Sequence, residues 1–194
     1  MSLLIAPFAI FDLWFVPEYW NPKTLFNWPI GVEGFAFAFA SGGIAAVLYE
    51  EIARKGFFTQ GRQNTPLIQR LLLILGPLLV VALIIFTNLN LIYALSLGLG
   101  LGVVIIAAVR RDLLSDVFFS GFFFGLLYLG IFILLLKFFP DTLIVNRYNF
   151  ANLSGFNILE VPIEEFIWAV ATGAFVGPLY EFLVGLKLKH LPSK

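Results

Sequence analysis

Long apolar stretches alternate with short polar connections along the chain, which is the pattern of helices that cross a membrane. Four of these stretches are long enough to span about 30 Å of hydrocarbon as helices, and a fifth contains one acidic residue near its start. The expected spans run about Gly31 to Tyr49, Leu67 to Thr87, Leu91 to Val109, Val117 to Phe139 and Val161 to Leu186. We therefore predict an all-α fold.

The first residues leave the number of spans open. Ser2 to Val16 is apolar but short, and Pro7 and Asp12 interrupt it. It lacks the basic start and the small-residue cleavage site of a signal peptide, so it is either a sixth span or a helix at the interface. Loops of three to about twenty residues join the spans. We expect residues 1–194 to form a single polytopic transmembrane helical bundle of five to six spans.

Glycine and proline positions predict how the helices pack. Gly76-Pro77 lies inside the second long span and should kink it. Gly98, Gly100 and Gly102 give the next span a small face that another helix could approach closely. Both features are explained by bundle packing alone.

The composition excludes several classes of protein. Of the 194 residues 60% are hydrophobic and only 12% charged, about half the usual charged content of a soluble domain. The chain contains 23 Phe, one His and no Cys, which argues against disulfides, thiol catalysis and a transition-metal site. The net charge is zero with no basic tract, so nucleic acid is not an expected partner. No glycine-rich loop indicates nucleotide binding.

The basic residues indicate an orientation. Nine of the twelve Lys and Arg residues fall on one side of the predicted spans, together with five of the twelve acids. The nine are Arg54, Lys55, Arg62, Arg70, Arg110, Arg111, Lys187, Lys189 and Lys194, and the three on the other side are Lys23, Lys137 and Arg147. We expect the first side to be cytoplasmic and to carry the C-terminus. The opposite side is acidic and contains Trp14, Trp20 and Trp28, typical of an interfacial belt.

An internal repeat joins the two ends of the chain. A shift of 131 positions lays Val32–Glu50 over Ile163–Glu181 with eight of nineteen positions identical. The identical pairs are Glu33/Glu164, Phe35/Phe166, Ala38/Ala169, Ala40/Ala171, Gly42/Gly173, Leu48/Leu179, Tyr49/Tyr180 and Glu50/Glu181. Upstream, with small shifts, Asp12 matches Asp141, Val16 matches Val145, and Trp20-Asn21 matches Tyr148-Asn149. We predict two units, about 11–53 and about 140–184.

The repeat predicts a shared seam. Three spans separate the two Glu-bearing helices, so both run in the same direction and the repeat is parallel, with its axis along the membrane normal. This arrangement would bring Glu33 and Glu164 to similar depth near the outer boundary. A site with two similar halves suits a substrate with two similar ends.

Three acids at these helix starts are candidates for proton chemistry: Glu33, Glu164 and Glu165. In each copy an aromatic residue follows the matched Glu at i+4, Phe37 or Trp168, and a hydroxyl follows at i+8. These spacings place the side chains on one helical stripe. A carboxyl group in an apolar seam could donate a proton, and the aromatic faces could stabilise a carbocation. Taken alone, Glu165 or Glu160 is better explained by a helix-capping role exposed to water.

A second set of acids lies at the cytoplasmic ends of the same helices. Glu50 and Glu51 are followed at i+4 by Arg54 and Lys55, the favourable order for helical ion pairs. With Glu181, we interpret them as a solvated interfacial face.

The stretch Asn146 to Phe166, reading NRYNFANLSGFNILEVPIEEF, resembles the membrane lycopene cyclase domain. That family occurs as paired bacterial subunits, as an archaeal fusion and within fungal bifunctional proteins. Its hallmark is an aromatic-Asn loop, a Gly, and Pro-x-Glu-Glu-Phe opening a helix. Pro162, Glu164, Glu165 and Phe166 match it in the second copy. In the first copy the loop fits at Trp20-Asn21-Pro22, but the helix opens Gly31-Val32-Glu33-Gly34-Phe35, without the Pro and without the second Glu.

The resemblance implies cyclisation of an acyclic carotenoid end group without a cofactor. Glu33, Glu164 and Glu165 would then be the acid and base candidates. Phe37 and Trp168 would line the cation site, Asn21 and Asn149 could orient the carboxyl groups, and Trp20 and Tyr148 would complete the substrate-binding loops. The implied partners are membrane lipid and a hydrophobic polyene or isoprenoid, in a homo- or hetero-oligomer or a single chain. The implied location is the plasma membrane of a prokaryote.

Two other classes remain as alternatives. A non-catalytic protein that binds lipid or carotenoid, or that assembles a larger membrane complex, would also use many Phe residues. A CAAX-type intramembrane protease is less well supported. The segment Glu50–Gly56 loosely resembles the paired-Glu motif of that family. That family needs His residues in later spans, and His190 in the tail is the one His of this chain.

Overall fold

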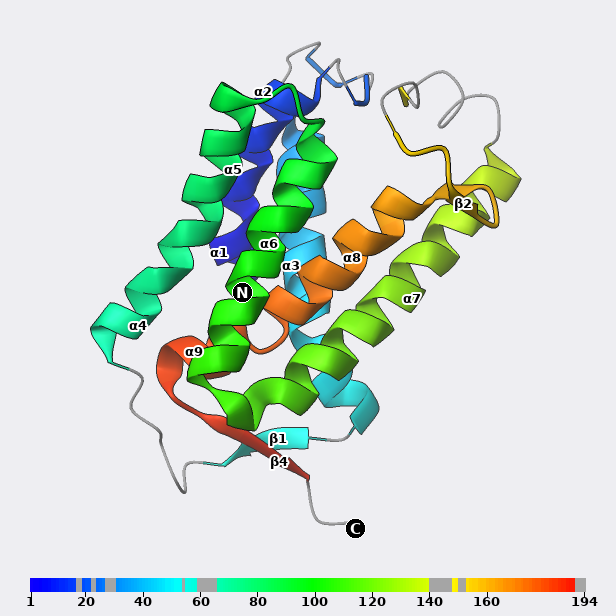
Figure 1. Cartoon of the computed structure of the whole chain (residues 1–194). Helices are drawn as coiled ribbons and strands as arrows, with labels where there is room; N and C mark the ends of the chain where they lie inside the picture. Colours follow the sequence, from blue (N-terminus) through cyan, green and yellow to red (C-terminus); the bar gives the residue numbers. More distant parts are fainter. Residues whose placement is uncertain are drawn as a thin grey trace.

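The computed structural model describes residues 1–16, 19–21, 24–26, 31–53, 55–58, 66–139, 148–149 and 153–190, with the side chains of 55–58 and 187–190 not described. It confirms an all-α chain: within these residues five apolar helices are long enough to cross a membrane (Figure 1). Their apolar residues line the outside of the bundle, as expected of a protein solvated by lipid.

The helices fall close to the predicted spans. The long helical segments are α3 (Val32–Ala53), α4–η2–α5 (Leu67–Leu71, Leu72–Ile74 and Leu75–Phe86), α6 (Leu91–Val109), η3–α7 (Arg111–Leu113 and Leu114–Phe138) and α8–α9 (Ile163–Val176 and Leu179–Val184). Short paired strands cap the bundle: β1 (Lys55–Phe58) with β4 (Lys187–His190), and β2 (Asn157–Ile158) with β3 (Val161–Pro162). These strands are too short to form a sheet core.

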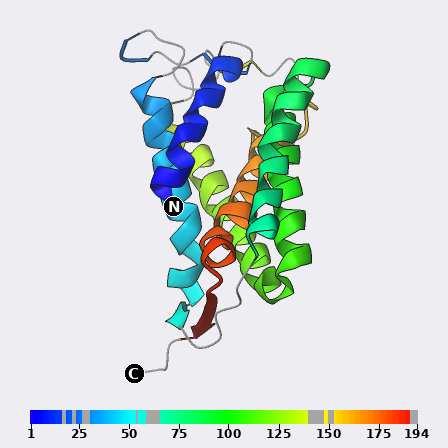
Figure 2. The ribbon, with the colours of Figure 1, turned by 90° about the vertical axis from the view of Figure 1, so that its left-hand side faces the viewer.

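The first residues form one short helical segment and not a sixth long span. It consists of α1 (Ser2–Ile5), η1 (Ala6–Phe11) and α2 (Asp12–Phe15), and its 3₁₀ turns begin beside Pro7. Fourteen residues rise about 21 Å as a helix, less than the hydrocarbon thickness. The N-terminus consequently lies halfway along the bundle, while α2 ends among the loops at one end (Figures 1 and 2).

α8 is the central helix. Over half of the α8–α9 span, 56%, is buried, against 11–33% for the other four spans. α7 and α6 pack along α8, α5 packs on the far side of α6, and α3 packs against α8, α7 and the N-terminal segment. Residues at the start of α8 are therefore surrounded by protein, although α8 begins near one end of the bundle (Figure 1).

Prolines shape two of the spans. The segment Leu72–Ile74 is 3₁₀ immediately before α5, as expected where a proline ring displaces the carbonyl four residues earlier; the kink at Gly76-Pro77 stays a prediction. Gly177-Pro178 divides the last predicted span into α8 and α9. α9 then ends at Gly185, whose φ of 79° is a left-handed helix cap.

The glycine face of α6 is used in part. Gly98 meets α5 so closely that a Cβ added there would lie 3.0 Å from the carbonyl oxygen of Gly76. Gly102 faces Phe175 of α8, whereas nothing lies within 4 Å of the corresponding position at Gly100. Gly98 and Gly102 are thus the two glycines of this face that make close helix contacts, and their four-residue spacing is typical of small residues between membrane helices.

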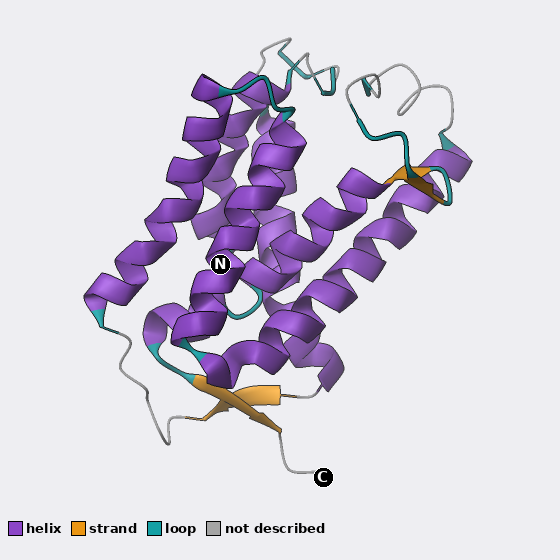
Figure 3. Cartoon of the chain, in the orientation of Figure 1, coloured by secondary structure: helices purple, strands orange, loops and turns teal. Residues whose placement is uncertain are grey.

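The end of the bundle opposite α2 holds β1, β4, the α6–α7 corner and the start of α4 (Figure 3). Arg110, at this corner, is 4% exposed and binds Asp112 through two hydrogen bonds of 2.8 and 2.9 Å. It also donates to the backbone oxygens of Glu181 and Leu186, so it ties α6 to α9. Several residues used above for orientation and the repeat lie outside the described residues: Pro22, Lys23, Trp28, Arg54, Arg62, Asp141, Val145, Asn146, Arg147 and Lys194.

Candidate active site at the start of the central helix

A tight hairpin positions the first turn of α8. Strands β2 and β3 pair across Leu159 and Glu160, which both have positive φ (50° and 69°). Pro162 precedes the helix as its N-cap residue, where proline's missing N–H is harmless. The N–H of Ile163 donates to the oxygen of Phe156 at 2.9 Å. The helix start is therefore held on both sides.

The two acids of this turn are buried and face different neighbours. Glu164 is 2% exposed and Glu165 is 3% exposed. Adjacent residues of an α-helix point about 100° apart, so the two carboxyl groups reach different elements. Burial of two adjacent acids is costly unless each finds donors.

Tyrosine hydroxyls bind both oxygens of Glu165. Tyr128 of α7 donates to Oε2 at 2.7 Å, and Tyr19, from the loop after α2, donates a hydrogen bond to Oε1. Both carboxyl oxygens of Glu165 are therefore satisfied by hydroxyl donors.

The tyrosine donors keep their protons. Burial, followed by the nearby Glu165 charge, raises the pKa of Tyr19 well above its usual value of 10.0. The same two causes raise the pKa of Tyr148, whose ring lies edge-on to Tyr19 at 5.6 Å between centroids. Both phenols therefore remain protonated throughout the physiological range.

The two carboxyl oxygens of Glu164 differ in their hydrogen bonding. Oε1 accepts a hydrogen bond from Tyr93 of α6 at 2.6 Å and from the backbone N–H of Ser154 at 2.7 Å. Oε2 is buried without a hydrogen-bond partner in the part of the chain that the structure describes. Because a buried unpaired carboxyl oxygen is unfavourable, this atom is the natural place for a proton or for contact with a ligand.

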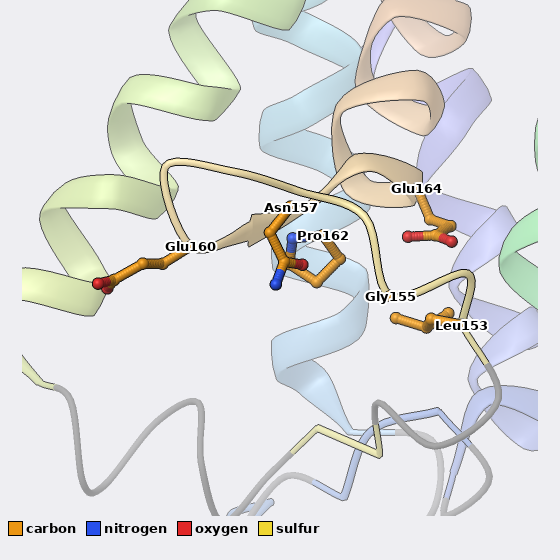
Figure 4. Close-up of a pocket in the computed structure, with 6 residues that line it drawn as sticks. All are labelled: Leu153, Gly155, Asn157, Glu160, Pro162 and Glu164. Atoms are coloured by element: carbon orange, nitrogen blue, oxygen red, sulfur yellow. The ribbon is translucent and has the colours of Figure 1, made fainter.

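Glu164 also lines a pocket of about 140 Å³ between the hairpin and the preceding loop. Leu153, Gly155, Asn157, Glu160 and Pro162 form the rest of its lining. In Figure 4 the Glu164 carboxyl group lies beside the loop at Leu153 and Gly155, and the Glu160 side chain points to the opposite side. Glu160 is exposed.

Aromatic residues predicted for the site lie in contact across the two ends of the chain. Phe37 of α3 stacks on Trp168 of α8 with 6.0 Å between centroids and 20° between planes, and Trp168 meets Tyr128 edge-on at 5.4 Å. Trp20 and Tyr148 form an antiparallel bridge, with their ring centroids 6.1 Å apart.

Other predicted residues lie at the edge of this arrangement. Glu33 is exposed at the start of α3 and accepts a hydrogen bond from the N–H of Leu25 at 2.7 Å, so its environment differs from that of Glu164. Asn21 and Asn149 are both exposed. The backbone N–H of Asn149 donates to the oxygen of Tyr19 at 2.8 Å, which places the second loop against the first. Orientation of the carboxyl groups by these Asn side chains stays a prediction.

The inner acids differ from the expected solvated face. Glu51 is exposed, but Glu181 is completely buried. The prediction was wrong for Glu181 because α9 turns inward after Gly177-Pro178 and packs Phe182 and Leu179 into the core. The carboxyl group of Glu50 is its neighbour.

The sequence interpretation missed the hydrogen-bond donors Tyr19, Tyr93, Tyr128 and Ser154. Tyr93 and Tyr128 offered a signal, since each is a hydroxyl within an otherwise apolar span and must find a partner there. Tyr19 and Ser154 lie in loops, where only the tertiary fold shows that they approach α8.

Comparison with curated proteins and with solved structures found no match. Comparison with protein-family models found one described as lycopene cyclase, which matches residues 90–183. The matched region contains α6, α7 and the α8 turn with Glu164 and Glu165, and ends before the completion of α9. The match confirms the resemblance seen in the second copy of the sequence: residues 90–183 are similar to the lycopene cyclase domain.

Proposed function

We propose that this protein cyclises the end group of a lycopene-like carotenoid, with Glu164 and Glu165 as its acid–base pair. The observation that carries the proposal is the Glu164 carboxyl group. It is buried within the lycopene cyclase match, it lines a pocket, and its Oε2 has no hydrogen-bond partner in the described structure.

Glu164 supplies the proton. Its Oε1 is held by Tyr93 and the N–H of Ser154, which directs a proton to Oε2. Transfer of that proton to the terminal double bond leaves a tertiary carbocation. The π electrons of a neighbouring double bond then form the ring C–C bond, and loss of a proton to a carboxylate of the pair restores neutrality. The reaction is an isomerisation and consumes no cofactor.

Glu165 holds charge near the cation. Its carboxylate is kept in place by Tyr19 and Tyr128 and can offset positive charge electrostatically without bonding to substrate. The ring faces of Trp168 and Phe37 offer a further, weaker attraction to a cation. This division of roles follows from the different hydrogen bonding of two adjacent carboxyl groups.

The parallel repeat is part of the proposal. Contacts between matched positions support it, because residues near a two-fold axis meet their own counterparts. The matched positions in contact are Trp20 with Tyr148, Phe37 with Trp168 and Glu50 with Glu181. Two similar units would suit a polyene with two similar ends.

The membrane placement is likewise proposed. Five candidate spans support an integral membrane protein, and the basic residues at the β1–β4 end favour a cytoplasmic location for that end. We infer a prokaryotic plasma membrane, with the acid pair near the outer boundary and the polyene entering from lipid.

Expression in a lycopene-accumulating bacterium tests the function. Cyclised carotenoid, separated by chromatography, is expected from the wild type. Glu164→Gln should reduce ring formation by roughly 100-fold or more at equal protein level. Glu160→Gln is the matched control: it alters a Glu of the same pocket lining that is exposed, and it should leave cyclisation unchanged.

Three outcomes separate the alternatives. Unaltered lycopene with folded wild-type protein would refute the cyclase, and co-purification of unchanged polyene would then identify a binding protein. Activity that survives Glu164→Gln but is lost in Glu51→Gln would move the site to the inner end, where the paired-Glu protease motif lies. Equal activity of both Gln variants would remove the acid role of Glu164.

A further inference from the structure

The first repeat unit departs from the family pattern at two glycines, and both have a carboxyl group against them. Gly31 stands where the second copy has Pro162, and Gly34 stands where it has Glu165. A Cβ added at Gly31 would collide with the Glu33 carboxyl oxygen Oε2. A Cβ added at Gly34 would collide with the Asp12 carboxyl oxygen Oδ2. At both glycines, therefore, a carboxyl group occupies the space that a side chain would fill.

Asp12 reaches this space from the neighbouring helical segment. It begins α2, and its Cγ lies 3.1 Å from the position that a Cβ of Gly34 would take. Ala9 is the next nearest side chain there, at 3.8 Å. Gly34 itself is buried, and Asp12 is partly buried. An ionisable group within an apolar helical segment is costly, and it usually marks function.

The second copy has the reverse arrangement at the matched position. There the carboxyl group comes from α8, as Glu165, and the neighbouring helix α7 contributes the hydroxyl of Tyr128. In the first copy the neighbouring segment contributes the carboxyl group and α3 contributes the gap at Gly34. Among the described residues, the place beside the helix start therefore holds one carboxyl group in each unit; Asp141, which the sequence matches to Asp12, lies outside them.

We infer that Asp12 is the second carboxyl group of the first repeat unit, standing in for the glutamate that Gly34 replaces, and that with Glu33 it forms the counterpart of Glu165 and Glu164. This inference rests on the proposed cyclase function, and it assigns Asp12 the charge-holding role of Glu165. The chain then has two carboxyl pairs, one in each repeat unit.

Relocating the carboxyl group tests the inference. Asp12→Asn should lower cyclisation by roughly 100-fold at equal protein level. Gly34→Glu alone should lower the melting temperature in detergent, because the new side chain meets the Asp12 carboxyl group. The double variant Asp12→Ala with Gly34→Glu recreates the arrangement of the second copy, and should recover both the melting temperature and cyclisation.

A neutral version of the double variant separates charge from packing. Asp12→Ala with Gly34→Gln has the same volume without the acid, so it should recover the melting temperature but not ring formation. Cyclisation in Asp12→Asn equal to the wild type would overturn the role of Asp12 and leave the proposed function intact. A wild type that forms no ring would overturn both. Equal melting-temperature losses for Gly34→Glu with and without Asp12 would refute the shared space itself.

Discussion

The hydrogen bond between Tyr128 and Glu165 is the contact on which the proposed charge-holding role of Glu165 most depends. Tyr128→Phe removes the donor 2.7 Å from Oε2 and changes little else. The phenyl ring keeps the shape that packs on Trp168 and Phe132, at 5.4 and 6.0 Å between centroids. The variant therefore reports the loss of one hydrogen bond to a carboxyl group that is 3% exposed.

The expected cost is about 1–1.7 kcal/mol. A buried acceptor left without a partner costs about 1–3 kcal/mol, while hydrogen bonds between membrane helices reach about 1.7 kcal/mol at most. The lower range applies because Tyr19 still donates to the other oxygen. Reversible unfolding in mixed micelles measures the free energy of unfolding. Cyclisation should fall as well, since the Glu165 carboxylate is less firmly held.

A double-mutant cycle decides whether the hydrogen bond is responsible. In a Glu165→Met background, Tyr128→Phe should cost much less, because no carboxyl group is left unpaired. Tyr93→Phe provides a comparison of a milder change. Glu164 Oε1 still accepts the hydrogen bond from the N–H of Ser154, so this variant should lose less free energy of unfolding than Tyr128→Phe. Equal losses for Tyr128→Phe in both Glu165 backgrounds would show that ring packing, and not the hydrogen bond, accounts for the change.

Three further outcomes follow from the fold. Replacing Leu159-Glu160 by Asn-Gly should raise the free energy of unfolding by about 1–2 kcal/mol, since a turn with two positive φ angles, here 50° and 69°, favours Asn and Gly. Chemical unfolding measures this gain, and no gain would refute turn strain. Gly98→Leu should separate α5 from α6 at Gly76 and cost over about 2 kcal/mol, whereas a neutral result in the same unfolding assay would refute the close contact. Burial and the neighbouring carboxylate raise the pKa of Tyr19 above 10.0, so the unfolded chain loses this proton first and stability should fall as pH rises above 10. Unfolding measured from pH 8 to 11 should show a smaller fall in Tyr19→Phe, and equal slopes would contradict the assignment.

Much of the fold was predictable because lipid imposes simple rules. Apolar stretches of sufficient length must form helices, and the predicted Leu91–Val109 span coincides with α6. The interruption of the last span at Gly177-Pro178 follows from proline chemistry, but its consequence does not. The inward turn of α9, which buries Glu181, depends on packing against α6 and α7.

The candidate site was predictable only in part. Glu164 and Glu165 stand out because charge is scarce in this chain and their neighbours match a known pattern. Their partners Tyr93 and Tyr128 lie 71 and 37 residues away. Both are on helices that are apolar on most sides, and such a composition does not specify how a helix is rotated about its axis. The place of Asp12 beside Gly34 has the same origin, since a glycine in the sequence does not say which side chain fills its space.

The sequence by itself determined that lipid solvates the protein, where the helices lie and which acids are candidates for the site. These follow from hydropathy, from span length and from the rarity of charge. The tertiary structure alone decided which acids are buried, which hydroxyls bind them and which Glu164 oxygen has no partner among the described residues. The reason is physical: helices that face lipid are apolar on nearly every side, so the hydrophobic pattern does not specify how each helix is rotated about its axis. Close packing at glycines and pairing of the few polar groups then set it.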